Sequence, residues 1–304
     1  MAAGPACSVI VPTRRRVAQL AACLESLAEL DMPRGRFEVL VLDDGGGEPE
    51  LDELVDSYGE RLDVTLSRLP ARGSAAARNE GARRARAALL VLTDDDCTFD
   101  RGWLAALERA AAPGVAVAGR TVNGAPNSVW AAAAHVIVDT GYAWSNRRRV
   151  RFAASNNLAF PRDGYLAVGG FDERYARSSD RDLCDAWLAS GRRIVYSPDA
   201  VARHQQRLTL ASFVAKHFAN GRGVARFHRR HVERGARRVL PEPGYYAALL
   251  RAAAATRPGR RAPLVLGLVG LALGANYLAY VLEYPRGLAP PKTPDQGEGS
   301  PVTS

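Results

Sequence analysis

The sequence predicts an α/β protein built around a mainly parallel sheet that helices cover on both faces. Short runs dominated by apolar residues alternate with helical segments over the first hundred residues. Apolar strands in this alternation are typical of parallel sheets buried on both faces. Acidic residues directly follow two of the runs, at Asp43 and Asp44 and again at Asp94, Asp95 and Asp96. Because open sheets of this kind bind ligands at the carboxyl ends of their strands, these acids are expected to line one crevice.

The individual elements follow from residue spacing and from the turn residues that end each run. The expected strands cover residues 7–11, 37–42, 64–69, 88–92, 153–160 and 194–196. The expected helices cover residues 17–30, 51–58, 74–86, 180–190 and 213–232. Gly221 and Gly223 are expected to interrupt the last of these helices, and residues 120–150 show no clear pattern.

Residues 263–282 form an apolar segment without a charge, long enough to span a bilayer as one helix. Arginines on its amino side predict that this side stays on the cytoplasmic face. Gly270 and Gly274 are spaced like a helix-contact face. The alternative is an apolar helix packed on the protein or on a partner. Residues 284–304 are rich in Pro, Gly and Ser and are expected to be disordered.

The net charge of +9 is concentrated in one stretch of the chain. Residues 203–238 hold ten Lys and Arg residues and one acid, Glu233, so the remainder is balanced. Such a stretch attracts phosphate-rich surfaces, either nucleic acid or anionic lipid. Only Lys216 and Lys292 are lysines, so a lone arginine is weak evidence of a site in this chain. The four cysteines form no C-x-x-C pair and are expected to be reduced and mostly buried, as in a cytoplasmic protein.

The acidic triplet Asp94, Asp95 and Asp96 is the strongest indication of chemistry. Adjacent carboxylates repel one another, and a cation relieves that repulsion. Mg²⁺ and Mn²⁺ suit carboxylate and phosphate oxygens, which predicts a metal bound together with a phosphorylated ligand. The alternative is a solvated acidic turn, but the position after a buried strand favours the metal.

Three other segments are candidates for the same crevice. Asp43 and Asp44 precede three glycines that allow a ligand to approach the backbone closely. The alternative for this segment is an ordinary acidic turn between a strand and a helix. Arg78 lies one turn into a helix and is placed to reach a diphosphate, although it fits a surface arginine as well. Asp180 stands at a helix start, where the helix dipole favours its anion and where it suits a general base. The alternative for this last group of acids is helix capping.

Six short motifs occur in the order seen in family 2 glycosyltransferases, which the sequence resembles over roughly residues 7–230. They are SVIVPT at 8–13, VLVLDDG at 39–45, ARNEG at 77–81, LTDDD at 92–96, GGFDE at 169–173 and DRDLC at 180–184. The resemblance implies a GT-A-type nucleotide-binding sheet, a nucleotide-sugar donor and a Mn²⁺ or Mg²⁺ ion. Together with the basic stretch and the apolar segment, it gives the full fold prediction, a GT-A-like sheet with a C-terminal helical, membrane-associating appendage.

The resemblance also implies a role for each matched residue. The donor-binding residues would be Thr13, Asp43, Asp44, Arg78, Asp94 and Asp95, with Thr13 and one of the paired acids at the nucleoside. Asp96 would be the direct metal ligand, and Asp94 would contact the ribose or the metal. His204 matches a further metal or diphosphate contact, and a partly buried histidine is the alternative. Asp180 matches the catalytic base, but Ser179 stands where the family usually has Glu.

These residues predict a metal-dependent transferase that moves a hexosyl or deoxyhexosyl group to a hydroxyl acceptor. A single base without a second nucleophilic carboxylate predicts one displacement with inversion. The apolar segment suggests a lipid-linked or cell-envelope glycan as acceptor, at the cytoplasmic face of the membrane. The expected domains are 1–205 for catalysis, 206–261 for a basic helical extension, 262–283 for membrane association and 284–304 for a tail.

Other functions fit less well. The order D-x-D-x-T at 94–98 is found in haloacid-dehalogenase-like phosphatases, but there it follows the first strand, and neither lysine here precedes an acidic pair. A dinucleotide oxidoreductase needs G-x-G-x-x-G where this chain has TRRR at 13–16. A nucleic-acid-binding protein that uses residues 222–238 remains the alternative class, although no binding module is present and nucleic acid is not the expected partner.

Overall fold

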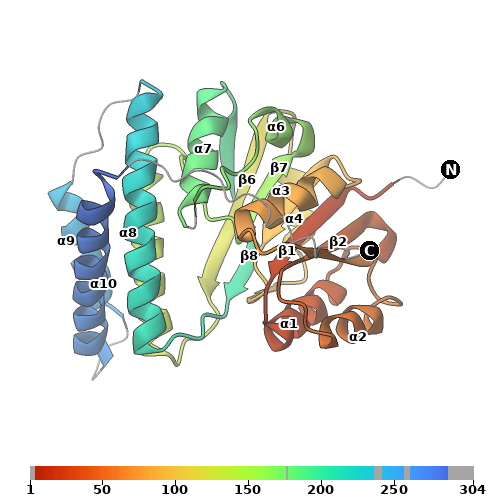
Figure 1. Cartoon of the computed structure of the whole chain (residues 1–304), viewed down its shortest axis with the longest axis horizontal. Coiled ribbons are helices and arrows are strands. Elements are labelled where there is room, and N and C mark those ends of the chain that lie inside the picture. Colours follow the sequence, from red (N-terminus) through yellow and green to blue (C-terminus); the bar gives the residue numbers. More distant parts are fainter. Residues whose placement is uncertain (1–3, 176, 236–241, 257–260, 287–304) are drawn as a thin grey trace, which may run out of the picture.

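The computed structural model describes residues 4–175, 177–235, 242–256 and 261–286, so the expected disordered tail lies outside the described residues from 287 onward. The strands are β1 (Cys7–Thr13), β2 (Phe37–Asp44), β3 (Val64–Leu69), β4 (Leu89–Thr93), β5 (Cys97–Phe99), β6 (Val115–Asn123), β7 (Asn157–Pro161) and β8 (Arg193–His204). The helices are α1 (Val17–Ala28), α2 (Glu50–Ser57), α3 (Ser74–Arg84), α4 (Trp103–Ala110), α5 (Val129–Ser145), α6 (Arg162–Ala167), α7 (Ser179–Ala189), α8 (Leu210–Glu233), α9 (Pro243–Ala254) and α10 (Arg261–Glu283), and a short 3-10 helix covers Arg34–Arg36. The predicted α/β class is confirmed (Figure 1).

The strands form a single sheet in the order β3-β2-β1-β4-β7-β6-β8-β5. β1 pairs in parallel with β2 and β4, and β2 pairs in parallel with β3. β7 runs antiparallel to both β4 and β6, and β5 runs antiparallel to β8. The sheet is therefore parallel in its N-terminal half, as predicted, and mixed beyond β4.

Helices cover both faces of the sheet. Residues 9–11 of β1 are therefore all apolar, because each face of the strand is buried. Val9 and Val11 are buried among side chains of α1, α2 and α4. Ile10, between them, is buried on the opposite face with side chains of α3, α6 and α7. The four cysteines are free and buried, as expected.

The middle of the chain was not recognised from sequence. α5 contains the run Ala131 to Ala134, which offers little helical periodicity. β8 is longer than the expected strand 194–196, and it continues through Pro198 beside β6. A register shift between Gly119 and Arg120 of β6 accommodates this continuation. As a result β8 ends at His204, next to β5.

α8 is one continuous helix, so the predicted interruption at Gly221 and Gly223 is wrong. Both glycines instead allow close packing. A Cβ at Gly221 would clash with the carbonyl oxygen of Asn276 in α10, and a Cβ at Gly223 would clash with the carbonyl oxygen of Arg177. The two glycines therefore let the α8 backbone approach α10 and the loop before α7.

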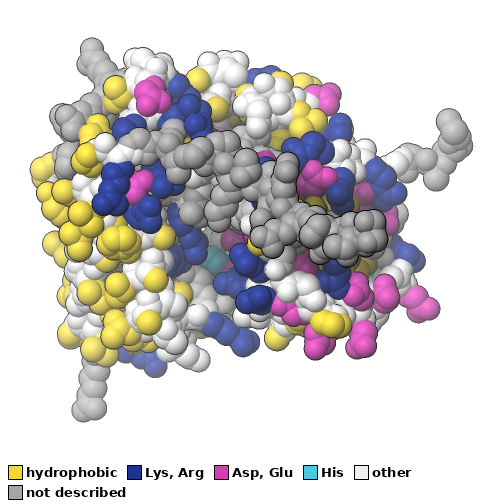
Figure 2. All heavy atoms as spheres, in the orientation of Figure 1, with side chains coloured by type: hydrophobic (Ala, Val, Ile, Leu, Met, Phe, Trp, Pro, Cys, Tyr) yellow, Lys and Arg dark blue, Asp and Glu magenta, His cyan; other side chains and the backbone are white. Residues whose placement is uncertain are grey.

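α10 is the one helix of the described residues that is long and apolar enough to cross a membrane. Val265, Val269 and Ala272 pack with α5, α8 and α9. A Cβ added at Gly270 or Gly274 would find no atom within 4 Å, so these glycines form no helix-contact face within the described chain. The exposed apolar side chains of α10 are Leu264, Leu271, Tyr277, Leu278, Val281 and Leu282. Hydrophobic atoms accordingly gather on the side of the molecule where α9 and α10 lie (Figures 1 and 2).

The basic stretch 203–238 does not present its charge as one positive surface. Carboxylates of neighbouring elements pair with most of its described arginines, and residues 237 and 238 lie outside the described residues. The pairs are Arg203 with Asp100, Arg222 and Arg226 with Glu283, Arg230 with Asp172, and Arg234 with Asp182 and Asp185. The stretch therefore ties α8 to α7 and α10, which weakens the expectation that it binds nucleic acid or anionic lipid as a unit.

Candidate active site

A large cleft of about 2180 Å³ opens at the carboxyl ends of β1, β2 and β4. Thr13, Asp44 and the acidic triplet line it from the sheet, and residues of α5, α8 and α10 line the opposite wall. The expectation that the acids after the strands share one crevice is met by Asp44 and the triplet. Asp43 does not line the cleft. The C-terminal helices thus form part of the site as well as an appendage.

The three carboxylates of the triplet have different partners. Asp94 forms an ion pair with Arg78. Asp95 accepts hydrogen bonds from the Thr13 hydroxyl at 2.8 Å and from Arg16 at 2.8 Å. Burial raises the pKa of Asp95 to about 6, although Arg16 and Thr13 act to lower it. Asp95 therefore anchors β1 to the triplet from inside the protein.

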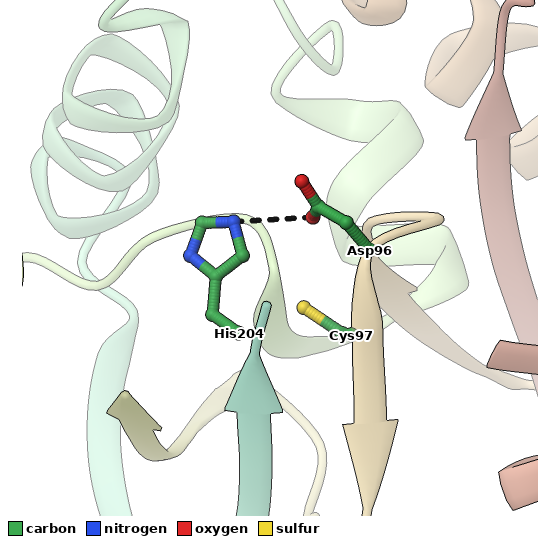
Figure 3. Close-up of side chains that lie close together, drawn as sticks. All are labelled: Asp96, Cys97 and His204. Carbon is green, nitrogen blue, oxygen red and sulfur yellow. Dashed lines mark ion pairs between the residues drawn. The ribbon is translucent and has the colours of Figure 1, made fainter. Parts of the chain in front are cut away.

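Asp96 carries the features of a metal ligand. One of its oxygens lies 3.1 Å from His204 Nε2 at the end of β8 (Figure 3). The other lies 3.1 Å from Arg16. Burial acts to raise the pKa of Asp96, but His204 and Arg16 outweigh it and hold the pKa below the ordinary value. The distance between the Asp96 oxygen and the His204 nitrogen fits two adjacent ligands of an octahedral ion, which lie about 3 Å apart at metal–ligand distances of about 2.1 Å. Carboxylate oxygens suit Mn²⁺ and Mg²⁺, and the imidazole of His204 would add one nitrogen ligand.

Cys97 completes a cluster with Asp96 and His204 (Figure 3). Its thiol is fully buried, and burial raises its pKa well above the ordinary value. A thiol that stays protonated is a poor ligand, and a hard cation prefers oxygen. Of the three residues, Asp96 and His204 are therefore the two that could hold a divalent cation.

The acids of β2 hold loops together. Asp43 accepts hydrogen bonds from the backbone amides of Gly46 and Gly47 at 2.8 and 2.9 Å. Asp44 accepts them from the amides of Arg72 and Gly73 at 2.8 and 2.9 Å. Both carboxylates are buried, and of the two only Asp44 also lines the cleft. A contact with the nucleoside is thus better supported for Asp44 than for Asp43.

Arg78 is not the surface arginine that composition alone suggests. Its side chain is 6 % exposed, and its guanidinium lies 5.6 Å from the ring centre of Phe171. Its Nε atom is buried without a hydrogen-bond partner among the described residues. A buried guanidinium beside Asp94 at the wall of the cleft is well placed for a diphosphate.

Asp180 lines the cleft at the first turn of α7, and Asp185, further along the helix, lines it as well, whereas Asp182 does not. Asp182 forms an ion pair with Arg234 at 2.9 Å, and Asp185 pairs with Arg234 and His231. The helix dipole was expected to keep Asp180 ionised, but burial raises its pKa above the ordinary value. The cost of desolvating the charge therefore exceeds the effect of the helix start.

Two polar residues of the cleft were not found from sequence. Arg16 bridges Asp95 and Asp96, and Lys216 on α8 contacts Gln206 beside His204. The rarity of lysine in this chain was a usable signal for Lys216. No comparable signal marked Arg16, because it is one arginine among 39.

The mixed sheet, covered by helices on both faces and carrying the acidic triplet at its carboxyl edge, has a GT-A-type fold. The chain belongs to the family described as Glycosyl transferase family 2, whose model matches residues 8–165. Both the predicted family and the predicted fold class are thereby confirmed.

Several known proteins are similar to this chain. A pre-mycofactocin glycosyltransferase of Mycobacterium tuberculosis is 30% identical over 272 residues, which are 86% of this chain and 56% of that protein. A glucosyl-dolichyl phosphate glucuronosyltransferase of Haloferax volcanii is 26% identical over 189 residues, which are 55% of this chain and 58% of that protein. This chain therefore spans little more than half of either relative. The solved structure of mannosyltransferase PcManGT from Pyrobaculum calidifontis, in complex with GDP-Man and Mn²⁺, aligns with a TM-score of 0.59 at 22% identity, over 92% of this chain and 79% of that one.

Proposed function

We propose that this glycosyltransferase is metal-dependent and inverting, and that it moves a hexosyl or deoxyhexosyl group from a nucleotide-diphosphate donor to a hydroxyl acceptor. The observation that carries the proposal is the pairing of Asp96 with His204 in the cleft, 3.1 Å apart at the ends of different strands. These two residues would hold Mn²⁺ or Mg²⁺, which when bound neutralises charge on the leaving diphosphate. The solved mannosyltransferase with GDP-Man and Mn²⁺ shares the fold and lends support.

The chain's own residues have distinct parts in the proposed reaction. Thr13 and Asp44 lie at the β1–β2 side of the cleft, where we place the nucleoside. Arg78 stabilises the negative charge that develops on the diphosphate as the bond from the anomeric carbon to the phosphate oxygen breaks. Asp180 accepts the proton of the acceptor hydroxyl as its oxygen forms the new bond to the anomeric carbon. No second carboxylate is assigned as a nucleophile, which favours a single displacement.

For the acceptor we propose a lipid-linked or cell-envelope glycan. The relative named as a glucosyl-dolichyl phosphate glucuronosyltransferase supports this choice. So does α10, whose Asn276 and Tyr277 line the cleft while other side chains of the helix expose an apolar surface. We further propose that residues 1–205 supply the catalytic sheet and that the helices after residue 205 close the cleft and face the membrane from the cytoplasmic side.

The donor assignment is tested by a thermal-shift panel of GDP, UDP and dTDP with and without Mn²⁺. A ligand that binds the native state stabilises it by mass action, by about 2.7 kcal/mol at 100 times its dissociation constant. We expect at least one diphosphate to raise the melting temperature, and to raise it further with Mn²⁺. If none of the three binds the folded protein in Mn²⁺ while DNA does, the transferase proposal is wrong and the nucleic-acid alternative gains.

The membrane assignment is tested by flotation with vesicles of neutral and anionic lipids. Replacing Leu264, Leu271 and Leu278 by Gln removes three exposed apolar side chains from α10 without touching its packed face. Burying such side chains contributes about 1.5–3 kcal/mol each, so the triple variant is expected to float at least about tenfold less. The matched control replaces the exposed residues Leu166, Tyr196 and Leu210, which lie on other elements. Equal loss in both variants, or in neither, would argue against α10 as the membrane contact.

A further inference from the structure

Lys216 is a largely buried cation that has no acidic partner among the described residues. It lines the cleft from α8, and its ammonium donates a hydrogen bond to the side-chain oxygen of Gln206. Within the described part of the chain, no carboxylate lies at ion-pair distance from it, whereas in the same cleft Arg16 pairs with two carboxylates and Arg78 with one. Buried charges are ordinarily paired, so an unpaired ammonium in a cleft indicates a place for an anionic ligand.

The neighbours of Lys216 place it close to Asp96 and His204, the two proposed metal ligands. Gln206 lies 3.3 Å from Nδ1 of His204, and Nε2 of His204 lies 3.1 Å from Asp96. Lys216 is therefore connected to Asp96 through a chain of side-chain contacts by way of Gln206 and His204. His204 ends β8, Gln206 lies in the loop after it, and Lys216 lies in α8. In the sheet, β8 is separated from β1 and β2 by other strands.

The charges around Lys216 favour an incoming anion. Arg177, in the loop before α7, also lines the cleft and forms no ion pair in the described residues, and its charge acts to lower the pKa of Lys216. Burial is the larger cause, and the two together outweigh Asp94 and Asp96 and lower this pKa to about 8. A bound phosphate would offset both the cost of desolvating the Lys216 ammonium and its repulsion from Arg177.

We infer that Lys216 binds the sugar-proximal phosphate of the donor diphosphate. It would do so on the other side of Asp96 and His204 from Arg78. The inference rests on the proposed function, because it takes the nucleoside to lie at Thr13 and Asp44. With the nucleoside at β1 and β2, the phosphate nearer the sugar extends toward β8 and α8. Lys216 is then the cation that meets the second phosphate, and a nucleoside monophosphate does not reach it.

The test compares diphosphate with monophosphate binding by calorimetry, with GDP against GMP and UDP against UMP in saturating Mn²⁺. Lys216→Met is expected to weaken binding of the diphosphate about 10- to 100-fold, as for loss of a hydrogen bond to a charged group. Monophosphate binding should change less than about threefold. Lys216→Arg should restore most of the diphosphate affinity. Arg203→Met is the control, since it removes one positive charge outside the cleft.

A purely structural role makes a different prediction. If Lys216 serves only to orient Gln206 and His204, Lys216→Met will weaken Mn²⁺ binding without nucleotide, measured by the electron paramagnetic resonance of free Mn²⁺. It will then weaken mono- and diphosphate binding alike, and this result overturns the inference. Equal diphosphate affinity in Lys216→Met and wild type also overturns it. If wild type binds neither GDP nor UDP, the proposed donor class fails first, and the inference fails with it.

Discussion

Asp180→Asn is expected to lower sugar transfer by about 10²–10⁴-fold while donor affinity and fold stay unchanged, which is the usual cost of removing a general base. Asn keeps the size of the side chain and accepts the same hydrogen bond from the Arg181 amide that Asp180 accepts at 2.9 Å. It does not accept a proton from the acceptor hydroxyl. The measurement is the single-turnover rate at saturating donor, together with the dissociation constant of the donor diphosphate.

The pH profile gives a second readout for Asp180. Burial raises its pKa above the ordinary value, and a base works only when it is ionised. Transfer by the wild type should therefore fall as the pH drops through this raised pKa. The residual activity of Asp180→Asn should not fall over this pH range. A variant that only misplaces the acceptor would still show the fall at low pH.

Two acids on the same helix serve as controls for Asp180. Asp185→Asn changes a carboxylate that also lines the cleft but pairs with His231 and Arg234, and it should transfer sugar at close to the wild-type rate. Asp182→Asn loosens a buried ion pair with Arg234 and should cost stability more than chemistry. If Asp182→Asn abolishes transfer in folded protein while Asp180→Asn does not, the base has been assigned to the wrong residue. If neither matters, single displacement is wrong for this protein.

The N-terminal half of the fold was predictable because its strands are short and apolar and its turns are marked by Pro, Gly and Asp. β3 was placed at its observed bounds, and β1, β2 and β4 were placed within two residues. The middle was not predictable because packing decides it. α5 is rich in small and apolar residues, and β8 extends through Pro198 only because β6 pairs beside it with a shifted register.

The candidate site was predictable in its residue types but not in its contacts. The triplet, Arg78, Asp180 and His204 were expected, and all of them line the cleft. The bridge from Arg16 to Asp95 and Asp96 spans about 80 positions of sequence, and no local pattern reports such a contact. Likewise, the sequence shows that Asp180 stands at a helix start, where the helix dipole lowers its pKa. It does not show the burial, which raises that pKa by more.

Asp96→Ala is expected to reduce Mn²⁺ affinity by at least about 100-fold, because even residues that only support a ligand commonly contribute 10- to 100-fold. The affinity is measured without nucleotide, by the resonance of free Mn²⁺, so the result does not depend on turnover. The Mn²⁺-dependent part of diphosphate binding should vanish with it. Asp100→Ala is the matched control, since Asp100 also pairs with an arginine but lies outside the lining of the cleft.

Relief of repulsion within the triplet, taken alone, predicts that Asp96→Ala leaves stability level or raises it. The structure changes this expectation, because Asp96 is already compensated by Arg16 and His204. Arg16 is about half exposed and keeps its bond to Asp95, so the loss should stay within about 1 kcal/mol in chemical denaturation. Unfolding of the variant would mean that the Asp96–His204 contact is structural. Wild-type Mn²⁺ affinity in a stable variant would mean that the ion binds elsewhere, and the assignment of Asp96 and His204 as its ligands would have to be abandoned.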